Sequence, residues 1–326
     1  MNYRKFGKTD LLVSEIGFGG WAIGGGAMVG STAIGWGNAN DAISKEAILK
    51  SIALGVNFFD TADIYGLGHS EELLGKIVGN HKDVIIATKV GNVSRNDQFT
   101  YDYSKKYILG ACDASLKRLK REYIDYYQLH TARLSDLQKG DCIEAMQILQ
   151  QSGKVRYWGL SLNTYEPFPE ADYMLDNHAG SGFQLAFNMI NQTALPLIKK
   201  AFSLGYGVIA RMPLQFGLLT GKFDNGAKFP DNDHRKTRLT KEIIEAYKLN
   251  MERIWVLCEK YNVTRVQLAL SYILSYPEIS TVIPGIRTVE QAENNFSGII
   301  QMEKEDIALI ENTNFSITMA VIRQQG

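Results

Sequence analysis

Short apolar segments rich in Val, Ile, Phe and Tyr recur along the whole chain, and each is followed by a segment with helical spacing. Most of these apolar segments are continuous rather than alternating in polarity, which is typical of parallel strands covered on both faces. Eight core strands are predicted, at residues 17–21, 56–61, 84–90, 124–130, 155–161, 183–189, 207–212 and 281–284. The repeated strand and helix pattern favours an α/β chain with one closed parallel sheet, a (β/α)8 TIM barrel, over two domains. Residues 1–326 are therefore expected to form a single barrel domain.

The helical segments have apolar faces that would pack on such a barrel. One face runs through residues 107–119 and another through residues 73–78. Ser44 and Ser70 each stand just before acidic residues, so both are expected to be helix N-caps.

Two further features lie outside the regular strand and helix pattern. Residues 3–6 and 11–14 flank a GKTD turn ahead of the first core strand, and they predict a β-hairpin that closes the bottom of the barrel. Residues 24–40 and 222–240 are too long for simple connectors. Loops of this length are usually functional lids or disordered segments.

The charge balance excludes several classes of partner. The 326 residues carry 35 basic and 35 acidic side chains, so no net positive field attracts nucleic acid or an anionic membrane. Residues 1–12 include basic side chains but no apolar export segment follows them, and no apolar segment reaches the roughly 18 residues of a spanning helix. Three separated cysteines, Cys112, Cys142 and Cys258, form no metal-binding motif. A cytoplasmic protein without a metal site is expected.

Two nucleotide-binding motifs are present only formally. The segment GFGGWA at residues 17–22 satisfies GxGxxA, but three glycines follow at residues 24–26, so no helix can begin there as a Rossmann motif requires. The GKT segment at residues 7–9 lacks the upstream glycine of a P-loop, and the chain contains no HExxH. Neither an NTPase nor a zinc protease is supported.

Four ionisable side chains stand at the ends of predicted strands. Asp60 ends one strand and Tyr65 lies just beyond it, while Lys89 and His130 end two others. Each residue alone has a common structural explanation, such as a solvated carboxylate or a hydrogen-bonded core histidine. Together they would meet at the carboxyl-terminal face of a β/α barrel, where catalytic residues gather.

The chain resembles the aldo-keto reductase family, in particular its bacterial general-stress and inositol-utilisation branch, in the segment FFDTADIYGLGHSEELLGK. The segments IATKV, SLKRL, YIDYYQLH, GKVRYWGLS, PLQFGLLTGKF and VIPGIRTVEQAENNF resemble it in the same order, up to about Gly298. The resemblance implies an oxidoreductase that binds NADP(H) or NAD(H) without a Rossmann domain and reduces aldehydes or ketones by hydride transfer. It places the catalytic tetrad of the family on Asp60, Tyr65, Lys89 and His130.

The chemistry of carbonyl reduction assigns a role to each member of this tetrad. The carbonyl oxygen needs a proton once hydride arrives, yet a free tyrosine has a pKa of about 10. Tyr65 is expected to be the general acid, with Lys89 lowering its pKa and Asp60 holding Lys89. His130 is expected to donate a hydrogen bond to the substrate oxygen.

The resemblance also implies a nicotinamide site. Its expected residues are Gly20, Trp21, Ser161, Asn163, Gln184, Arg211, Met212, Pro213 and Leu214. Trp21 fits either the ribose side of this site or the substrate pocket. Leu162 stands where the family has an asparagine, and Arg211 stands where many members stack a tyrosine on the nicotinamide. A guanidinium can also stack, but it adds charge beside the redox centre and so bears on the preferred direction of the reaction.

The rest of the cofactor is expected along two later segments. A pyrophosphate-side loop is expected at Gly217, Leu219, Gly221 and Lys222, and an adenosine site at Gly285, Arg287, Gln291, Asn294 and Asn295. The planar donor fork of Arg287 suits a 2′-phosphate. Gln291 and Asn294 replace an arginine and a glutamate found in several members, so NADP(H) is favoured while NAD(H) stays possible.

Three functions are compatible with these residues. The first is reduction of a small aldehyde, ketone or sugar. The second is oxidation of a sugar, polyol or steroid alcohol, and the third is a cofactor-binding regulatory protein. A small carbonyl or alcohol substrate is expected, and Trp21, Trp36 and Tyr65, with Phe99 or Phe216, would give it an aromatic pocket. Trp36 is either an anchor of the first long loop or an exposed aromatic. The substrate itself and the oligomeric state are left open by the sequence.

Overall fold

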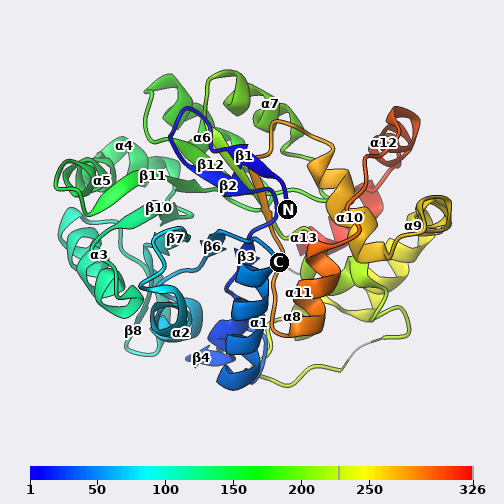
Figure 1. Ribbon diagram of the computed structural model, residues 1–326, viewed down its shortest axis with the longest axis horizontal. Coiled ribbons are helices and arrows are strands. Elements are labelled where there is room, and N and C mark those ends of the chain that lie inside the picture. The colour runs from blue at the N-terminus through cyan, green and yellow to red at the C-terminus, as the bar shows by residue number, and fades with distance from the viewer. Residues whose placement is uncertain (227, 325–326) are drawn as a thin grey trace.

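The computed structural model describes residues 1–226 and 228–324. Eight parallel strands form one sheet, in the order β14-β13-β12-β11-β10-β7-β6-β3. Parallel bridges from Ile16 to Val282 and from Gly19 to Gly285 join the two edges of this sheet. Helices surround the strands, as Figure 1 shows. The predicted (β/α)8 barrel is confirmed.

All eight predicted core strands are present. They are β3 (Phe18–Gly19), β6 (Phe58–Asp60), β7 (Ile85–Val90), β10 (Ile124–His130), β11 (Val155–Ser161), β12 (Gly182–Ala186), β13 (Gly207–Arg211) and β14 (Thr281–Ile283). The bounds of β10 and β11 are those predicted. The strand β13 ends one residue early because Met212 has a φ of 58°, which turns the chain out of the sheet.

The helices that cover the barrel carry the predicted apolar faces. The principal ones are α1 (Asp41–Ala53), α2 (His69–Val78), α3 (Lys105–Leu119), α5 (Asp141–Gln151), α6 (Phe168–Asp176), α7 (Leu195–Ser203), α10 (Arg265–Leu274) and α11 (Val289–Phe296). Four others, α4 (Leu134–Lys139), α9 (Lys241–Tyr261), α12 (Lys304–Glu311) and α13 (Ser316–Gln324), complete the outer layer. In α3 the buried side chains are Ile108, Cys112, Ser115, Leu116 and Leu119.

Both predicted N-caps are wrong. The side chain of Asn40 caps α1, and Ser44 lies inside the helix. Helix α2 begins after Gly68, and Ser70 lies within its first turn. The Ser70 hydroxyl instead donates to the carbonyl oxygen of Gly20 at 2.9 Å. A local pattern of serine and acidic residues cannot distinguish a cap from a buried tertiary hydrogen bond.

The predicted hairpin is present and closes the amino-terminal end of the barrel. Strands β1 (Tyr3–Lys5) and β2 (Leu12–Ser14) pair antiparallel, and they cross one end of the sheet in Figure 1. Phe6, which follows β1, is fully buried. Its ring lies so close to Gly182 and Gly207 that a Cβ at either glycine would approach it within 2.7 Å. The strand starts are therefore sealed, and the opposite end is the one that opens.

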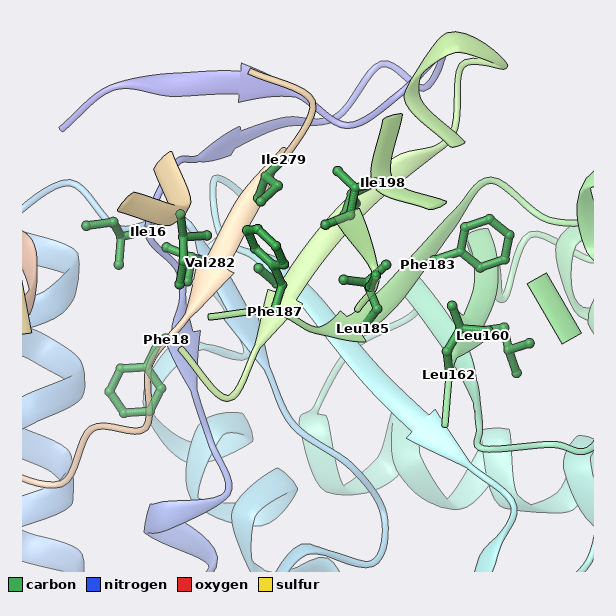
Figure 2. Close-up of a cluster of buried hydrophobic side chains, with 14 of the residues drawn as sticks. Ile16, Phe18, Leu160, Leu162, Phe183, Leu185, Phe187, Ile198, Ile279 and Val282 are labelled. Atoms are coloured by element: carbon green, nitrogen blue, oxygen red, sulfur yellow. The ribbon is translucent and has the colours of Figure 1, made fainter. Parts of the chain in front are cut away.

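Side chains alternate between the inside and the outside of the barrel along each strand. Figure 2 shows outward-facing ones, with Leu160 and Leu162 of the β11 segment near Phe183 of β12. Leu162 is 1% exposed and belongs to the main apolar cluster. Leu162, which stands where the sequence resemblance leads one to expect an asparagine, is therefore a core residue. The inward positions hold a smaller apolar cluster near the hairpin and polar side chains above it.

Both long loops contain short regular elements. Residues 24–40 include the hairpin of β4 (Ala27–Val29) and β5 (Thr32–Ile34), and residues 222–240 include α8 (Arg235–Arg238). A third hairpin, β8 (Asn92–Arg95) with β9 (Gln98–Tyr101), follows β7. Among the described residues, no helix has the length and apolar character needed to cross a bilayer.

Candidate active site

The alternation of side chains brings polar groups together at the open end of the barrel. On β6, Phe58 is inward and apolar, and Asp60 follows it two residues later on the same face. On β7 the inward positions run through Ile85 to Lys89, and β10 repeats the pattern from Tyr126 to His130. The period of two thus places one ionisable residue on the inner face near the carboxyl end of each of these three strands.

Lys89 is the centre of this group and is fully buried. Its Nζ donates to Asp60 Oδ2 at 2.6 Å, to the Thr61 carbonyl oxygen at 2.8 Å and to Tyr65 Oη at 3.0 Å. Burial alone would lower the pKa of Lys89, but attraction to Asp60 and Tyr65 outweighs it and raises that pKa. Lys89 is therefore an ammonium held by three oxygens.

Two glutamines fix the other oxygen of Asp60. Oδ1 accepts hydrogen bonds from Gln184 Nε2 at 2.7 Å and from Gln128 Nε2 at 3.2 Å. Both glutamines are buried, and Gln184 Nε2 also donates to Gln128 Oε1 at 3.2 Å. The sequence analysis missed Gln128, although a glutamine inside the apolar strand IDYYQLH is a signal that could have found it. The carboxylate orientation is thus set by side chains from two other strands of the barrel.

Tyr65 and His130 face each other with ring centroids 5.9 Å apart. Burial raises the pKa of Tyr65, and the attraction of Lys89 only partly offsets it. Lys89 acts on this pKa in the expected direction, but desolvation of the phenolate, which the sequence did not indicate, is the larger effect and makes the net change a rise. Burial, followed by repulsion from Lys89 and Arg211, holds the pKa of His130 well below its usual range. The imidazole is neutral at physiological pH.

A second layer of buried polar contacts fixes the helix behind the tetrad. Glu71 of α2 is fully buried and accepts from Thr88 Oγ1 at 2.5 Å and from Arg118 Nε at 2.7 Å. The Thr61 hydroxyl donates to Ser70 Oγ at 2.8 Å. These bonds tie α2 to β7, to α3 and to the segment after β6, which carries Tyr65. The tetrad is therefore held from both sides of the sheet.

A cavity of about 420 Å³ opens in front of this group. It extends from Asp60, Tyr65 and His130 to the first turns of α11. Lys89 does not line it and lies behind Tyr65. The predicted cofactor residues that line it are Trp21, Ser161, Gln184, Arg211, Met212, Pro213, Leu214, Gly217, Lys222, Gly285, Gln291, Asn294 and Asn295. The cavity has the volume of a small-molecule site.

The profile of the aldo/keto reductase family matches residues 15–314. This chain belongs to the aldo-keto reductase family. The uncharacterized oxidoreductase YqkF of Bacillus subtilis is 30% identical to it, over 96% of this chain and 96% of its own length. Two solved structures are also similar. The holo form of the aldo-keto reductase AKR11C1 from Bacillus halodurans gives a TM-score of 0.79 at 25% identity, with 97% of each chain covered.

The second solved structure is the glycerol dehydrogenase AKR11B4 from Gluconobacter oxydans. It gives a TM-score of 0.78 at 25% identity, over 95% of this chain and 94% of its own. The resemblance in the sequence motifs is thereby confirmed at the level of the family. The chain is an oxidoreductase acting on a carbonyl or alcohol group of a small molecule, and aldo-keto reductases use nicotinamide cofactors.

Five of the expected cofactor residues do not line the cavity of this aldo-keto reductase. The Gly20 N–H donates to the Asp60 carbonyl oxygen, and Asn163 Oδ1 accepts from the backbone of the loop after β11. Leu219 is a core residue, and Gly221 has a φ of 76° and packs against an arginine side chain. Arg287 Nη1 and Nη2 donate to backbone carbonyl oxygens of residues 36 and 38, each at 2.8 Å. The guanidinium of Arg287 therefore binds the backbone of the first long loop.

Arg211 lines the cavity beside the tetrad. Its Nη2 donates to the Leu162 carbonyl oxygen and to Thr164 Oγ1, both at 3.0 Å. Its Nε is buried and has no hydrogen-bonding partner among the described residues. Burial lowers the pKa of Arg211, and neighbouring Tyr65 partly restores it. A cation without a carboxylate partner in the described chain thus lines the same cavity as Tyr65 and His130.

Several cavity residues were not anticipated, and four of them come from the second long loop. They are Gly19, Thr131, Thr164, Thr220, Phe223, His234, Arg235, Arg238, Val266 and Ile283. Phe216 and Trp36 line the cavity, and Trp36 is only half-buried rather than an exposed loop aromatic. Phe99 does not line it and packs against the cluster that contains Tyr65. A sequence pattern does not show which loop side chains fold back over a barrel.

Proposed function

We propose that this aldo-keto reductase reduces an aldehyde or ketone to an alcohol, with Tyr65 as the proton donor and NADP(H) as the favoured cofactor. The observation that carries the proposal is the bond network of Lys89, which joins Asp60 and Tyr65 at 2.6 and 3.0 Å. A buried ammonium against a phenol has little structural value, because it costs desolvation. It has clear value if the phenol must become a phenolate.

The residues fit a nicotinamide cofactor in their polarity and placement. The buried Nε of Arg211 and Nδ1 of His130 lack partners among the described residues, and both belong to cavity-lining side chains. Gln291, Asn294 and Asn295 supply polar groups at the far end. When bound, the cofactor would supply or accept the hydride.

The proton transfer follows from the geometry of the tetrad. The raised pKa keeps Tyr65 protonated before reaction, so its hydroxyl can donate to the carbonyl oxygen. As the proton leaves, the ammonium of Lys89 stabilises the phenolate at Tyr65 Oη. The neutral ring of His130 donates a hydrogen bond that orients the oxygen. Asp60, fixed by two glutamines, keeps Lys89 charged and in place.

Replacement of Tyr65 by Phe tests this proposal. The variant keeps the aromatic ring but loses the proton, so kcat/KM for aldehydes should fall by about 10²- to 10⁴-fold. The assay is the oxidation of NADPH or NADH followed by absorbance. Tyr101→Phe is a matched control, because this tyrosine is 55% exposed and lies outside the cavity. Near wild-type turnover in a folded Tyr65→Phe protein would refute the role of Tyr65.

The preference for NADP(H) over NAD(H) is supported by positive charge at the cofactor end of the cavity. Lys222 lines the cavity, and the backbone N–H of Arg287 donates to Gln291 Oε1 at 2.7 Å, which places this arginine beside the lining residues. A 2′-phosphate would be attracted to both. A higher kcat/KM with NADPH than with NADH is expected, and a strong preference for NADH would reject the assignment.

Alcohol oxidation is a second candidate, and Arg211 favours it. Its positive charge disfavours an oxidised, positively charged nicotinamide nearby and so makes the bound oxidised form a stronger hydride acceptor. One similar structure is a glycerol dehydrogenase by name. Measurement of both directions on matched aldehyde and alcohol pairs decides between the two. Arg211→Gln should lower oxidation relative to reduction if the charge acts in this way.

A further inference from the structure

The two long loops, residues 24–40 and 222–240, contact each other and contribute side chains that line the cavity. Trp36 forms an antiparallel bridge with Asp233, and the His234 N–H donates to the Gly35 carbonyl oxygen at 3.1 Å. The guanidinium of Arg235 lies 5.0 Å from the centre of the Trp36 ring and pairs with Asp233 at 2.6 Å. Contacts between residues about 200 positions apart thus fix the position of His234.

His234 sits in an aromatic cluster that lines the cavity. Its ring centroid is 5.1 Å from that of Phe216, 5.4 Å from that of Trp21 and 6.4 Å from that of Trp36. The Trp21 ring is in turn 4.5 Å from the ring of Tyr65. Trp21 therefore contacts both His234 and the proposed proton donor, and all three side chains line the same cavity.

The hydrogen bond to Gly35 decides the tautomer of His234. Nδ1 lies 2.9 Å from the Gly35 carbonyl oxygen, which can only accept, so Nδ1 carries the proton. The other nitrogen, Nε2, is then a bare acceptor, and it makes no hydrogen bond to any residue described here. Burial lowers the pKa of His234 to about 4, and the Gly35 bond and Asp233 only partly oppose this. The ring is neutral at physiological pH.

Two donors without partners accompany this acceptor. The indole nitrogens of Trp21 and Trp36 are buried and have no hydrogen-bonding partner in the described part of the chain. Buried polar groups are nearly always paired in a functional complex, so a ligand is expected to satisfy them. A hydroxyl group both donates and accepts. An alkyl group would leave all three unpaired, and a carboxylate or phosphate could not donate to Nε2.

Building on the proposed carbonyl chemistry, we propose that His234 determines specificity by accepting a hydrogen bond from a substrate hydroxyl at Nε2. The substrate class is a hydroxylated aldehyde or ketone, or the corresponding polyol in the reverse direction. The surrounding indoles contact its carbon skeleton and donate to its oxygens. A site built to bond a hydroxyl discriminates strongly against the analogue that lacks it, because its own polar groups are then left unpaired.

Two substitutions separate the acceptor from the loop contact. The side-chain amide of asparagine lies at about the position of Nδ1, so its N–H group keeps the hydrogen bond to Gly35. The longer side chain of glutamine places its amide oxygen at about the position of Nε2, so it keeps the acceptor. The measured quantity is the ratio of kcat/KM for glyceraldehyde to that for propanal, and for erythrose to that for butanal. We expect His234→Asn to lower this ratio at least about tenfold and His234→Gln to keep most of it. His81→Asn is the control, because His81 is an exposed histidine outside the cavity.

Each outcome decides the proposal. If His234→Asn keeps the wild-type ratio, the proposal is overturned. If, in addition, His234→Gln loses the ratio, only the hydrogen bond between His234 and Gly35 matters. Binding of threitol and butan-1-ol, followed by tryptophan fluorescence, needs no turnover. If wild type turns over no carbonyl or alcohol but binds threitol more tightly, and His234→Asn abolishes that difference, the proposed function fails while the role of His234 stands. Equal binding of both alcohols by wild type refutes the role of His234.

Discussion

The ion pair of Lys89 and Asp60 gives the sharpest test of how this site is held. Its partners are 2.6 Å apart, and their side chains are 0% and 3% exposed. Replacement of Lys89 by Met leaves a buried carboxylate without its cation, and replacement of Asp60 by Asn leaves a buried ammonium. The double variant has neither charge, and the side-chain amide introduced in place of Asp60 still offers an oxygen to the two glutamines.

The magnitude follows from the separation and the burial. Two unit charges 2.6 Å apart attract by about 6 kcal/mol at an effective dielectric constant of about 20. The desolvation of both groups offsets most of this attraction in the intact pair. Each single substitution should therefore lower the free energy of unfolding by about 3–5 kcal/mol, because one desolvated charge stays without compensation. The double variant should lose much less than the sum of the two.

The assay is urea unfolding at pH 7, followed by circular dichroism on wild type, both single variants and the double variant. The coupling energy of the cycle should be at least about 2 kcal/mol, and all three variants should lose reductase activity. Additive losses, with no coupling, would show that the pair is solvated or absent. That result would refute the buried ion pair and the argument for its catalytic use.

Three further predictions concern the rest of the molecule. Burial lowers the pKa of His234 from about 6.5 in the unfolded chain to about 4 in the folded one, so the unfolded chain binds the proton first as the pH falls. The contribution of His234 to the free energy of unfolding is therefore complete above about pH 6.5 and is lost as the pH falls toward 4. Wild type should lose up to about 2 kcal/mol of unfolding free energy between pH 7 and 5, and an equal loss in His234→Gln would contradict this. Gly159→Ala should destabilise by about 1–3 kcal/mol or more in thermal unfolding, because its Cβ would lie 2.1 Å from the Gly182 carbonyl oxygen. Exposed, helical Gly110→Ala should instead stabilise by about 0.5–1 kcal/mol, and similar effects at both glycines would undermine the packing argument. Arg287→Met should loosen the first long loop and raise the KM for substrate and for both cofactors in steady-state assays, with a larger rise for NADPH than for NADH, and an unchanged preference between the two cofactors would remove Arg287 from the proposed 2′-phosphate site.

The sequence by itself determined the architecture and the meeting of Asp60, Tyr65, Lys89 and His130 at one end of the barrel. Hydrophobic periodicity is a local property, because a buried strand must be apolar wherever it lies in the chain. The eight strands and the hairpin could therefore be predicted, two of the strands to their end residues. This meeting of side chains could be predicted because Asp60, Lys89 and His130 interrupt apolar strands at their carboxyl ends, and family motifs surround them.

Only the tertiary structure decided the partners and the net electrostatics. Gln128 and Gln184 reach Asp60 from 68 and 124 residues away, and nothing near Asp60 in the sequence indicates them. The pKa of Tyr65 rises rather than falls, because its direction depends on how completely the folded chain excludes water. His234 reaches the cavity only because a loop 199 residues from Gly35 folds against it. Such contacts depend on packing between distant segments, which local sequence patterns do not encode.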